Sequence, residues 1–425
     1  MQVLEEKGLQ RAPRQGGHPA VLLSHPTGNQ NVRNALRSLA DHEMLAEFCT
    51  TVAVPPQSKW TKLLPASLRN QLVRRGYGEA PWERIACVPF RESVRLAAPS
   101  LRMEEILCSG ERPFSVIGMY RHFDARVARR LRQIRPTAVY AYEGGALETF
   151  REAKRLGMIT IYEQPSSYWH WVRNLLSEEA AHSPEFAGLL PNLRDSDSHL
   201  RWKDEELSLA DYVFVPSEHV RRTLSGAVPD EKIRVISYGA PEPKERKAAR
   251  ADPGQPLQVL FVGGLTQHKG IGYLLDAVAR VEHMVNLTLV GRRRPGNARL
   301  DAACRRWRWI ESLPHDQVLE LMTETDVLVL PSFGEGFGLV VTEALACGLP
   351  VIVTPNVGAA DLIRDGRNGF IVPVRSAESI AECLHRLSCN REELCEMSRH
   401  AQTTASERGW ETYREAWANA VRELC

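Results

Sequence analysis

Two carboxylates, Glu335 and Glu343, stand on either side of a glycine-rich turn with seven residues between them. The apolar run at residues 326–330 (DVLVL) predicts a buried strand before the turn. The pattern after the turn predicts a helix that starts near Gly338 and stops at Gly348. Both carboxylates are therefore expected at the carboxyl end of a strand, where ligands of parallel sheets bind.

The start of this predicted helix is suited to a phosphate group. Its first free N–H groups, from Gly338, Leu339 and Val340, would point into a cleft together with the positive end of the helix dipole. Neither Glu335 nor Glu343 should contact phosphate, but each can accept hydrogen bonds from sugar hydroxyls. The plainer interpretation is that Glu335 is an ordinary turn residue and that Glu343 is an acid on the helix surface. The strand–turn–helix frame favours the ligand-binding one.

A second strand–glycine–helix unit lies upstream and carries a lysine. Residues 257–262 (LQVLFV) predict a strand that runs into Gly263 and Gly264, and apolar residues at helical spacing follow. Lys269 lies at the mouth of that helix, where an ammonium can neutralise a departing phosphate. Neither a Walker A loop nor a GxGxxG fingerprint is present here. Taken alone, Lys269 would more often be a solvated surface lysine. Its pairing with the first unit favours a role at the phosphate.

The elements that position these residues alternate between short apolar runs and helical patterns, the signature of parallel sheets. In the first half we expect strands at residues 20–24, 138–142, 158–162 and 212–216. In the second half we expect strands at residues 257–262, 286–290, 326–330, 350–354 and 369–372. Residues 177–210 are polar and are interpreted as helices and a loop that close over one side.

The chain of 425 residues is too long for one ordinary core, so two domains are expected. Residues 1–240 are predicted to form an acceptor-binding Rossmann-like domain, and residues 257–400 a nucleotide-sugar-binding Rossmann-like domain. Between them, residues 241–256 are rich in proline and charge and are predicted to be a linker. Residues 401–425 are predicted to form a helix that returns to the first domain. The fold class predicted is α/β, with two doubly wound domains facing a central cleft.

Composition limits the class of protein and its compartment. The formal net charge of +2 gives no global attraction to nucleic acid, and 43% hydrophobic content is that of a globular protein. Nine cysteines without a CxxC pair fit a reducing cytosol. With no signal peptide and no long apolar run expected, we predict a cytoplasmic protein, with contact at the inner face of the membrane left open.

The two units together resemble the family of retaining, nucleotide-sugar-dependent glycosyltransferases with the GT-B fold, family 4 or "glycosyl transferases group 1". The resemblance covers residues 257–387, including NVGAADLI at 356–363 and DGRNGFIVP at 365–373. It implies a donor that is a nucleotide-diphosphate sugar, most often a UDP- or GDP-sugar. It also implies an acceptor hydroxyl on an unknown glycan, lipid-linked or small-molecule partner, and no requirement for a metal or other cofactor.

The resemblance also implies roles for particular residues. Glu335 and Lys269 are the catalytic candidates: Glu335 would contact the donor sugar and Lys269 the diphosphate. Glu343 would bind the ribose hydroxyls. The remaining donor-binding candidates are Gly28, Gly263, Gly264, Arg292, Gly336, Phe337, Gly338, Leu339 and Val340.

One position departs from the family pattern. The family usually has an arginine five positions before the lysine, and here that position is Gly264. Arg292 or Arg293 is the expected substitute, or donor binding is weaker. The alternatives are another GT-B enzyme, such as a sugar-nucleotide epimerase or a phosphorylase, and a catalytically silent GT-B module that binds a sugar nucleotide or scaffolds other enzymes.

The first half carries fewer matched motifs. Gly28 follows the first predicted strand, where the family's N-terminal glycine loop approaches the donor phosphates. For the acceptor side the candidates are Glu143 and Glu163, each at a predicted strand end, and His170. Many family members carry a histidine near the reacting sugar in this region. A lone histidine between tryptophans is more often structural, and its role is left open.

Three weaker patterns complete the survey. Asp195-Ser-Asp197 spells a DxD, but it follows no hydrophobic strand and is interpreted as chance. Six arginines from Arg121 to Arg135 lie on a predicted helix, usually a solvated face but also a possible contact with anionic lipid. Residues 305–309 (RRWRW) resemble a nucleic-acid patch but are too short and isolated for base stacking, and no nucleic-acid partner is expected.

Overall fold

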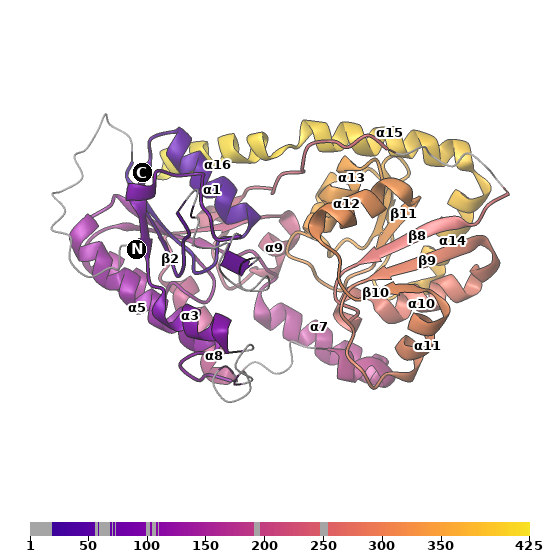
Figure 1. Cartoon of the computed structure of the whole chain (residues 1–425), viewed down its shortest axis with the longest axis horizontal. Coiled ribbons are helices and arrows are strands. Elements are labelled where there is room, and N and C mark those ends of the chain that lie inside the picture. The colour runs from indigo at the N-terminus through magenta and orange to yellow at the C-terminus, as the bar shows by residue number, and fades with distance from the viewer. Residues whose placement is uncertain are drawn as a thin grey trace.

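The computed structural model describes residues 19–55, 74–98, 110–190, 196–246 and 254–425, with isolated positions 58, 69, 71, 72, 103 and 108. These residues form two α/β domains placed side by side, with the C-terminal helices running along one edge of both (Figure 1). The predicted fold class is confirmed.

The first domain contains a parallel sheet in the order β3-β2-β1-β4-β5-β6-β7. Its strands are β1 (Val21–Ser24), β2 (Leu45–Thr50), β3 (Ile85–Cys87), β4 (Ala138–Tyr142), β5 (Ile159–Glu163), β6 (Tyr212–Val215) and β7 (Ile233–Val235). The order reverses between β1 and β4, as in doubly wound folds. The main helices are α1 (Gln30–Asp41), α3 (Phe90–Ala97), α5 (Val116–Ile134), α6 (Leu147–Arg155), α7 (Trp169–His182), α8 (Asp197–Ser208) and α9 (Glu218–Thr223).

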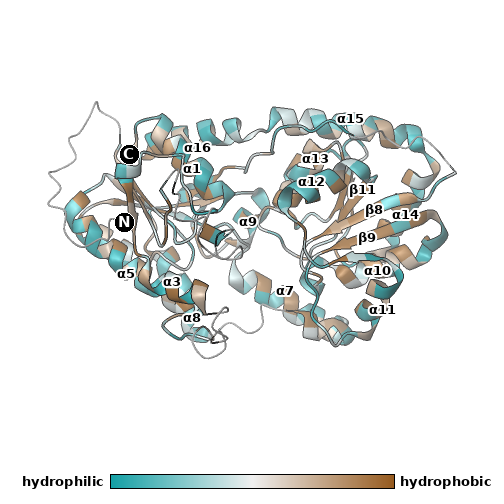
Figure 2. Ribbon diagram, viewed as in Figure 1, coloured by the Kyte–Doolittle hydropathy of each residue, from teal (hydrophilic) through white to brown (hydrophobic). Residues whose placement is uncertain are grey.

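The second domain repeats this plan with the order β10-β9-β8-β11-β12-β13, again parallel throughout. Its strands are β8 (Leu257–Val262), β9 (Val285–Val290), β10 (Arg308–Ile310), β11 (Val327–Leu330), β12 (Val351–Val353) and β13 (Gly369–Ile371). The helices around it are α10 (Ile271–Arg280), α11 (Ala298–Arg306), α12 (His315–Glu324), α13 (Leu339–Ala346) and α14 (Ala377–Cys389). Figure 2 shows hydrophobic strands inside and helices that turn hydrophilic residues outward.

All nine predicted strands are present, with ends within one residue of the prediction. The four strands not predicted are β2, β3, β7 and β10. The RRWRW segment is divided between the end of α11 and strand β10 at the sheet edge, where the Trp309 indole donates to the Gly291 carbonyl (3.0 Å).

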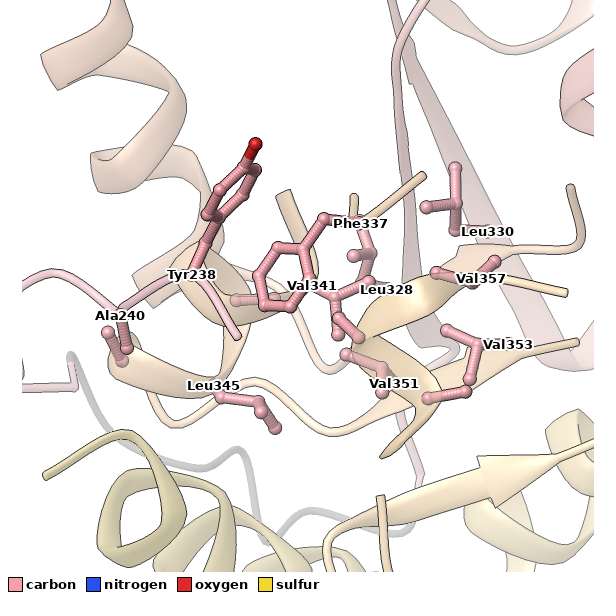
Figure 3. Close-up of a cluster of buried hydrophobic side chains, with 14 of the residues drawn as sticks. Tyr238, Ala240, Leu328, Leu330, Phe337, Val341, Leu345, Val351, Val353 and Val357 are labelled. Carbon is pink, nitrogen blue, oxygen red and sulfur yellow. The ribbon is translucent and has the colours of Figure 1, made fainter. Parts of the chain in front are cut away.

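The two domains are joined by two chain crossings. The segment after β7 passes through Tyr238 and Ala240, and the Lys244 amide donates to the Ala346 carbonyl of α13 (2.9 Å). Residues 247–253 of the predicted linker lie outside the described residues. Side chains around Tyr238 and Phe337 form a hydrophobic cluster that links the crossing to β11 and α13 (Figure 3).

The second crossing is made by α15 (Arg391–Glu407) and α16 (Trp410–Leu424), which are separated at Gly409, so residues 401–425 do not form the single predicted helix. Helix α16 lies against α1 in the first domain, where Ser38 donates to the Arg414 carbonyl (2.7 Å). Trp417 is fully buried and its indole donates to the Tyr140 hydroxyl (3.2 Å). The C-terminal helix thus completes the core of the first domain.

Candidate active site

A cavity of about 190 Å³ lies between the two domains. Both domains supply its walls, since the carboxyl ends of the two parallel sheets face each other there. From the first domain it is lined by Glu143, Ser166, Ser167, Trp169, Val172, Arg173, Leu200 and Lys203. From the second it is lined by His268, Lys269, Gly334, Glu335 and Gly336.

Lys269 and Glu335, the two catalytic candidates, form an ion pair on the second-domain wall. Lys269 ends a short 3₁₀ helix, Gln267–Lys269 (η6), and Gly270 then turns the chain with φ +74°. A Cβ on Gly270 would collide with the Pro331 carbonyl, so glycine allows the two loops to touch. The main chain of Glu335 is fixed by hydrogen bonds to residues 356 and 358. The Gly270 turn and these main-chain hydrogen bonds thus bring together two residues that are 66 positions apart in the chain.

Burial lowers the pKa of both basic side chains on this wall. It lowers the pKa of the Lys269 ammonium to about 8. The neighbouring His268 is also buried, and burial together with the Lys269 charge lowers the pKa of its imidazole to about 4. At neutral pH the wall therefore presents a neutral imidazole, an ammonium and a carboxylate. The sequence analysis missed His268, because a histidine beside a lysine carries no spacing signal of its own.

Glu143 faces this pair from the first domain. It follows β4, and its carboxylate is 3.2 Å from the Lys203 ammonium and accepts a 2.7 Å hydrogen bond from the Ser166 hydroxyl. Of the three acceptor-side candidates, Glu143 is the one that lines the cavity. Lys203 and Ser166 were not predicted, since they come from α8 and the β5–α7 loop, where the sequence pattern was weakest.

Glu163 and His170 do not line the cavity, and their assignment as acceptor-side residues stays a prediction. Glu163 is buried beneath it, where the hydroxyls of Tyr140 and Tyr238 donate to its carboxylate, the latter at 2.6 Å. His170 is exposed on α7 and stacks on the Trp169 ring at 3.6 Å. A strand-end position alone could not distinguish Glu143 from Glu163, because only the tertiary contacts show which carboxylate is covered.

The glycine loop before α13 has a second role that its sequence did not reveal. A Cβ on Gly336 would collide with the Pro165 carbonyl, and one on Gly334 would press into the Trp171 ring at 2.8 Å. Ser217 of the first domain donates to the Gly336 carbonyl (2.8 Å). These glycines therefore allow the two domains to touch. The ring of Phe337 is buried against Tyr238 (Figure 3), so its side chain is a core residue, and a donor contact by this residue stays a prediction.

The remaining candidates on α13 lie beside the cavity rather than in its lining. Gly338 caps the helix with φ +86°, a conformation that favours glycine, and the partly exposed Leu339 and Val340 form its first turn. Glu343, one turn further on, is 3.0 Å from the Nε2 of His315 at the start of α12. His315 is a partner that the sequence analysis missed.

The β8 glycines lie where two strand ends converge. The Gly263 amide donates to the Val290 carbonyl (2.9 Å), and Gly264 follows in the turn. Arg292 is exposed after β9, whereas Arg293 is paired with Asp301 and stacked over Trp309. Of the two expected substitutes for the missing arginine, Arg292 is the one without a carboxylate partner among the described residues.

Gly28 lies in the loop after β1, with φ +63° and no room for a Cβ beside the Tyr77 ring. Its amide donates to the Nδ1 of His25 (2.8 Å). Burial lowers the pKa of His25 to about 3, so this imidazole is a neutral acceptor that fixes the loop. The loop is thus rigid, and it does not contribute to the cavity lining.

The arginine-rich helix is α5, and several of these arginines are paired with carboxylates. Arg130 lies against Glu47, Arg132 against Glu152, and Arg121 against Glu111 at the helix start. Of the DxD, Asp195 lies outside the described residues, and the exposed Asp197 lies in the first turn of α8. Among the described residues, no group of three or more His, Cys, Asp or Glu side chains could hold a metal ion.

Comparison with known proteins identifies the class of the second domain. Residues 256–390 match the family model described as "Glycosyl transferases group 1". The D-inositol 3-phosphate glycosyltransferase of Streptomyces bingchenggensis is 33% identical over 198 residues, 42% of this chain and 44% of that protein. The putative colanic acid biosynthesis glycosyltransferase WcaL of Salmonella typhimurium is 27% identical over 184 residues, 39% and 45% of the two chains. The matched regions span less than half the length of these relatives.

Solved structures extend the likeness to both domains. Sucrose-phosphate synthase from Thermosynechococcus elongatus gives a TM-score of 0.67 at 18% identity, covering 96% of this chain and 99% of that one. Anabaena HepE in complex with UDP-glucose gives 0.60 at 16% identity, covering 96% and 100%. The fold is GT-B, and the second domain matches the group 1 glycosyltransferase model, as the sequence motifs indicated. No described helix is both long and apolar enough to cross a membrane.

The buried Glu163 should make the stability of the protein depend on pH. Burial raises its pKa from 4.5 to about 7, so the folded state holds this proton more tightly than the unfolded state. The resulting stabilisation is complete below about pH 4.5 and is lost as pH rises through 7, a difference of roughly 3 kcal/mol. Glu163→Gln should remove this decline and raise the melting temperature at pH 8. Thermal unfolding between pH 5 and 8 measures this pH dependence of the melting temperature, and the partly exposed Glu148→Gln is the control. If Glu163→Gln kept the pH dependence of the wild type, Glu163 would not be its source.

Proposed function

We propose that this protein is a retaining glycosyltransferase that moves a sugar from a nucleotide-diphosphate sugar to an acceptor hydroxyl. The observation that carries the proposal is the Lys269–Glu335 pair on the wall of a cavity between the two domains. The group 1 domain that contains both residues, and the curated relatives that are glycosyltransferases, support it. A UDP-sugar is the favoured donor because HepE was solved with UDP and with UDP-glucose, and a GDP-sugar is the alternative.

In the proposed reaction, the second domain stabilises the leaving group. The donor diphosphate takes the Lys269 ammonium from Glu335 and also binds at the start of α13, where amide dipoles favour an anion. Glu335, released from its ion pair, then accepts hydrogen bonds from the donor sugar hydroxyls. Glu343 binds the ribose, with His315 orienting its carboxylate. These groups replace the charge that a metal ion would supply, so we propose a metal-independent reaction.

The acceptor oxygen attacks the anomeric carbon from the face that the phosphate leaves. The bond from the anomeric carbon to the phosphate oxygen breaks as the bond to the acceptor oxygen forms, through an oxocarbenium-like state. The acceptor's proton passes to the leaving phosphate, and the anomeric configuration is retained. The protein's contribution is largely electrostatic, through groups already in place before the reaction.

A place in cell-surface polysaccharide or glycolipid synthesis in the cytoplasm accompanies this proposal. It is supported by the names of relatives such as WcaL. Contact with the inner face of a membrane through α5 would depend on those arginines that face solvent, such as Arg129 and Arg135.

A donor screen tests the reaction class. Purified protein is incubated with UDP-, GDP- and ADP-sugars, and slow release of free nucleotide is measured with nucleotide binding by calorimetry. One donor should be hydrolysed, and Glu335→Ala and Lys269→Ala should each lower the rate by about 10²–10³. The controls are Glu148→Gln and Lys154→Met, which change partly exposed charges outside the cavity lining. No binding of any donor would mean that the transferase proposal is wrong, whereas tight binding without hydrolysis in the wild type would mean that the acceptor is missing.

The Lys269 proton provides a second test. With a pKa of about 8, the side chain is an ammonium below pH 8 and becomes neutral above it. Nucleotide-sugar affinity should therefore fall as pH rises above about 8, by up to tenfold per pH unit. Lys269→Arg should bind with little pH dependence because guanidinium stays charged, and it also reports any titration of the nucleotide itself. Calorimetry between pH 6.5 and 9.5 measures this, and a flat wild-type profile would show that Lys269 does not hold the diphosphate.

A further inference from the structure

Helix α8 holds the first-domain wall of the cavity through three side chains on one short stretch. Glu206, fully buried, accepts hydrogen bonds from the amides of Gly144 (2.7 Å) and Ala146 (2.8 Å), the residues that follow Glu143. It also accepts from the Trp202 indole (2.9 Å). This carboxylate therefore fixes the loop from which Glu143 reaches the cavity.

The next contact fixes an aromatic ring. Asp204 accepts hydrogen bonds from the Trp169 indole (2.7 Å) and from the Tyr168 hydroxyl (2.8 Å). His170 stacks on Trp169, and the indole lines the cavity. The ring is thus held in one orientation by a hydrogen bond at its edge and by a second ring stacked on it. A tryptophan that served only to fill space would require neither the hydrogen bond to Asp204 nor the stacked His170 ring.

The third contact fixes a carboxylate. Lys203 lies 3.2 Å from Glu143, which also accepts from Ser166 at 2.7 Å. An ionised carboxylate has about four acceptor positions, so these two partners leave Glu143 able to accept further hydrogen bonds. Its side chain is only 12% exposed, and that exposure is toward the cavity it lines.

We propose that this wall is the acceptor subsite and that it binds an uncharged sugar ring, which the Trp169 ring contacts through its C–H groups and Glu143 through its hydroxyls. The inference rests on the proposed function and names the acceptor class. A rigid aromatic surface beside a hydrogen-bond acceptor matches a sugar ring, which is apolar on its faces and carries hydroxyls at its edge.

Charge argues for a neutral acceptor. Glu143 and Glu335 both line the same small cavity, and of its cations Lys269 is taken up by Glu335 or, in the proposed reaction, by the donor diphosphate. Lys203 is already paired with Glu143, and Arg173 is 3.6 Å from Asp197 at the rim. The cations of this wall therefore have carboxylate partners, whereas the hydroxyls of a neutral sugar supply the donors that Glu143 lacks.

Methyl α- and β-hexopyranosides of the gluco, galacto and manno series are the probes, tested by saturation-transfer NMR on the full chain with UDP or GDP present. Methyl glucuronide, glucose 6-phosphate and glycerol are the comparison ligands. At least one hexoside should bind, and Trp169→Ala and Glu143→Gln should weaken it tenfold or more while nucleotide binding stays within twofold. Asp204→Ala should lose part of the binding, and Asp204→Asn, which keeps an acceptor oxygen, should restore it.

The matched controls are Trp307→Phe and Glu148→Gln, which lie outside the cavity and should bind the hexoside as the wild type does. Hexoside binding that survives Trp169→Ala and Glu143→Gln would overturn the subsite. Binding of nucleotide with no hexoside bound, or with only the glucuronide or the phosphate bound, would also overturn it while leaving the proposed function in place. If the wild type bound neither UDP nor GDP, both proposals would fail.

Discussion

The contact between the glycine loop of the second domain and residues 165–171 of the first sets the width of the cavity. Gly334 and Gly336 lie so close to Trp171 and the Pro165 carbonyl that any Cβ would separate the domains. Ser217 reaches across the same junction to the Gly336 carbonyl. Because Glu335 lies between these two glycines, the residue that anchors the second-domain wall is placed by the domain contact itself.

Helix α7 strengthens this constraint from the other side. It belongs to the first half of the chain, yet its far end extends beside the second domain (Figure 1). There the buried Glu179 accepts from Gln267 (2.7 Å) and is paired with Arg375 (2.8 Å). Gln267 begins the turn that ends in Lys269, and the first residue of α7 is Trp169. One helix therefore spans from the acceptor wall to the turn that presents the ammonium.

The second domain was predictable from sequence, whereas the acceptor wall was not. Buried parallel strands such as β8 and β11 read as unbroken apolar runs, and their glycine turns mark the carboxyl ends. Strand β2 escaped detection because the buried Glu47 interrupts its pattern, and the partner that offsets this charge, Arg130, is 83 residues away. Lys203, His268 and Ser166 belong to the site only through tertiary contacts between elements far apart in the chain. Likewise, only burial distinguishes the structural Glu163 from Glu143.

The central claim is that Lys269 exchanges Glu335 for the donor diphosphate. A crystal structure of the protein with its nucleotide sugar tests this most directly. The account predicts the Lys269 Nζ at about 2.7–3.2 Å from a diphosphate oxygen, with the Glu335 carboxylate on a hydroxyl of the donor sugar. An intact Lys269–Glu335 ion pair, with the diphosphate bound elsewhere, would contradict it.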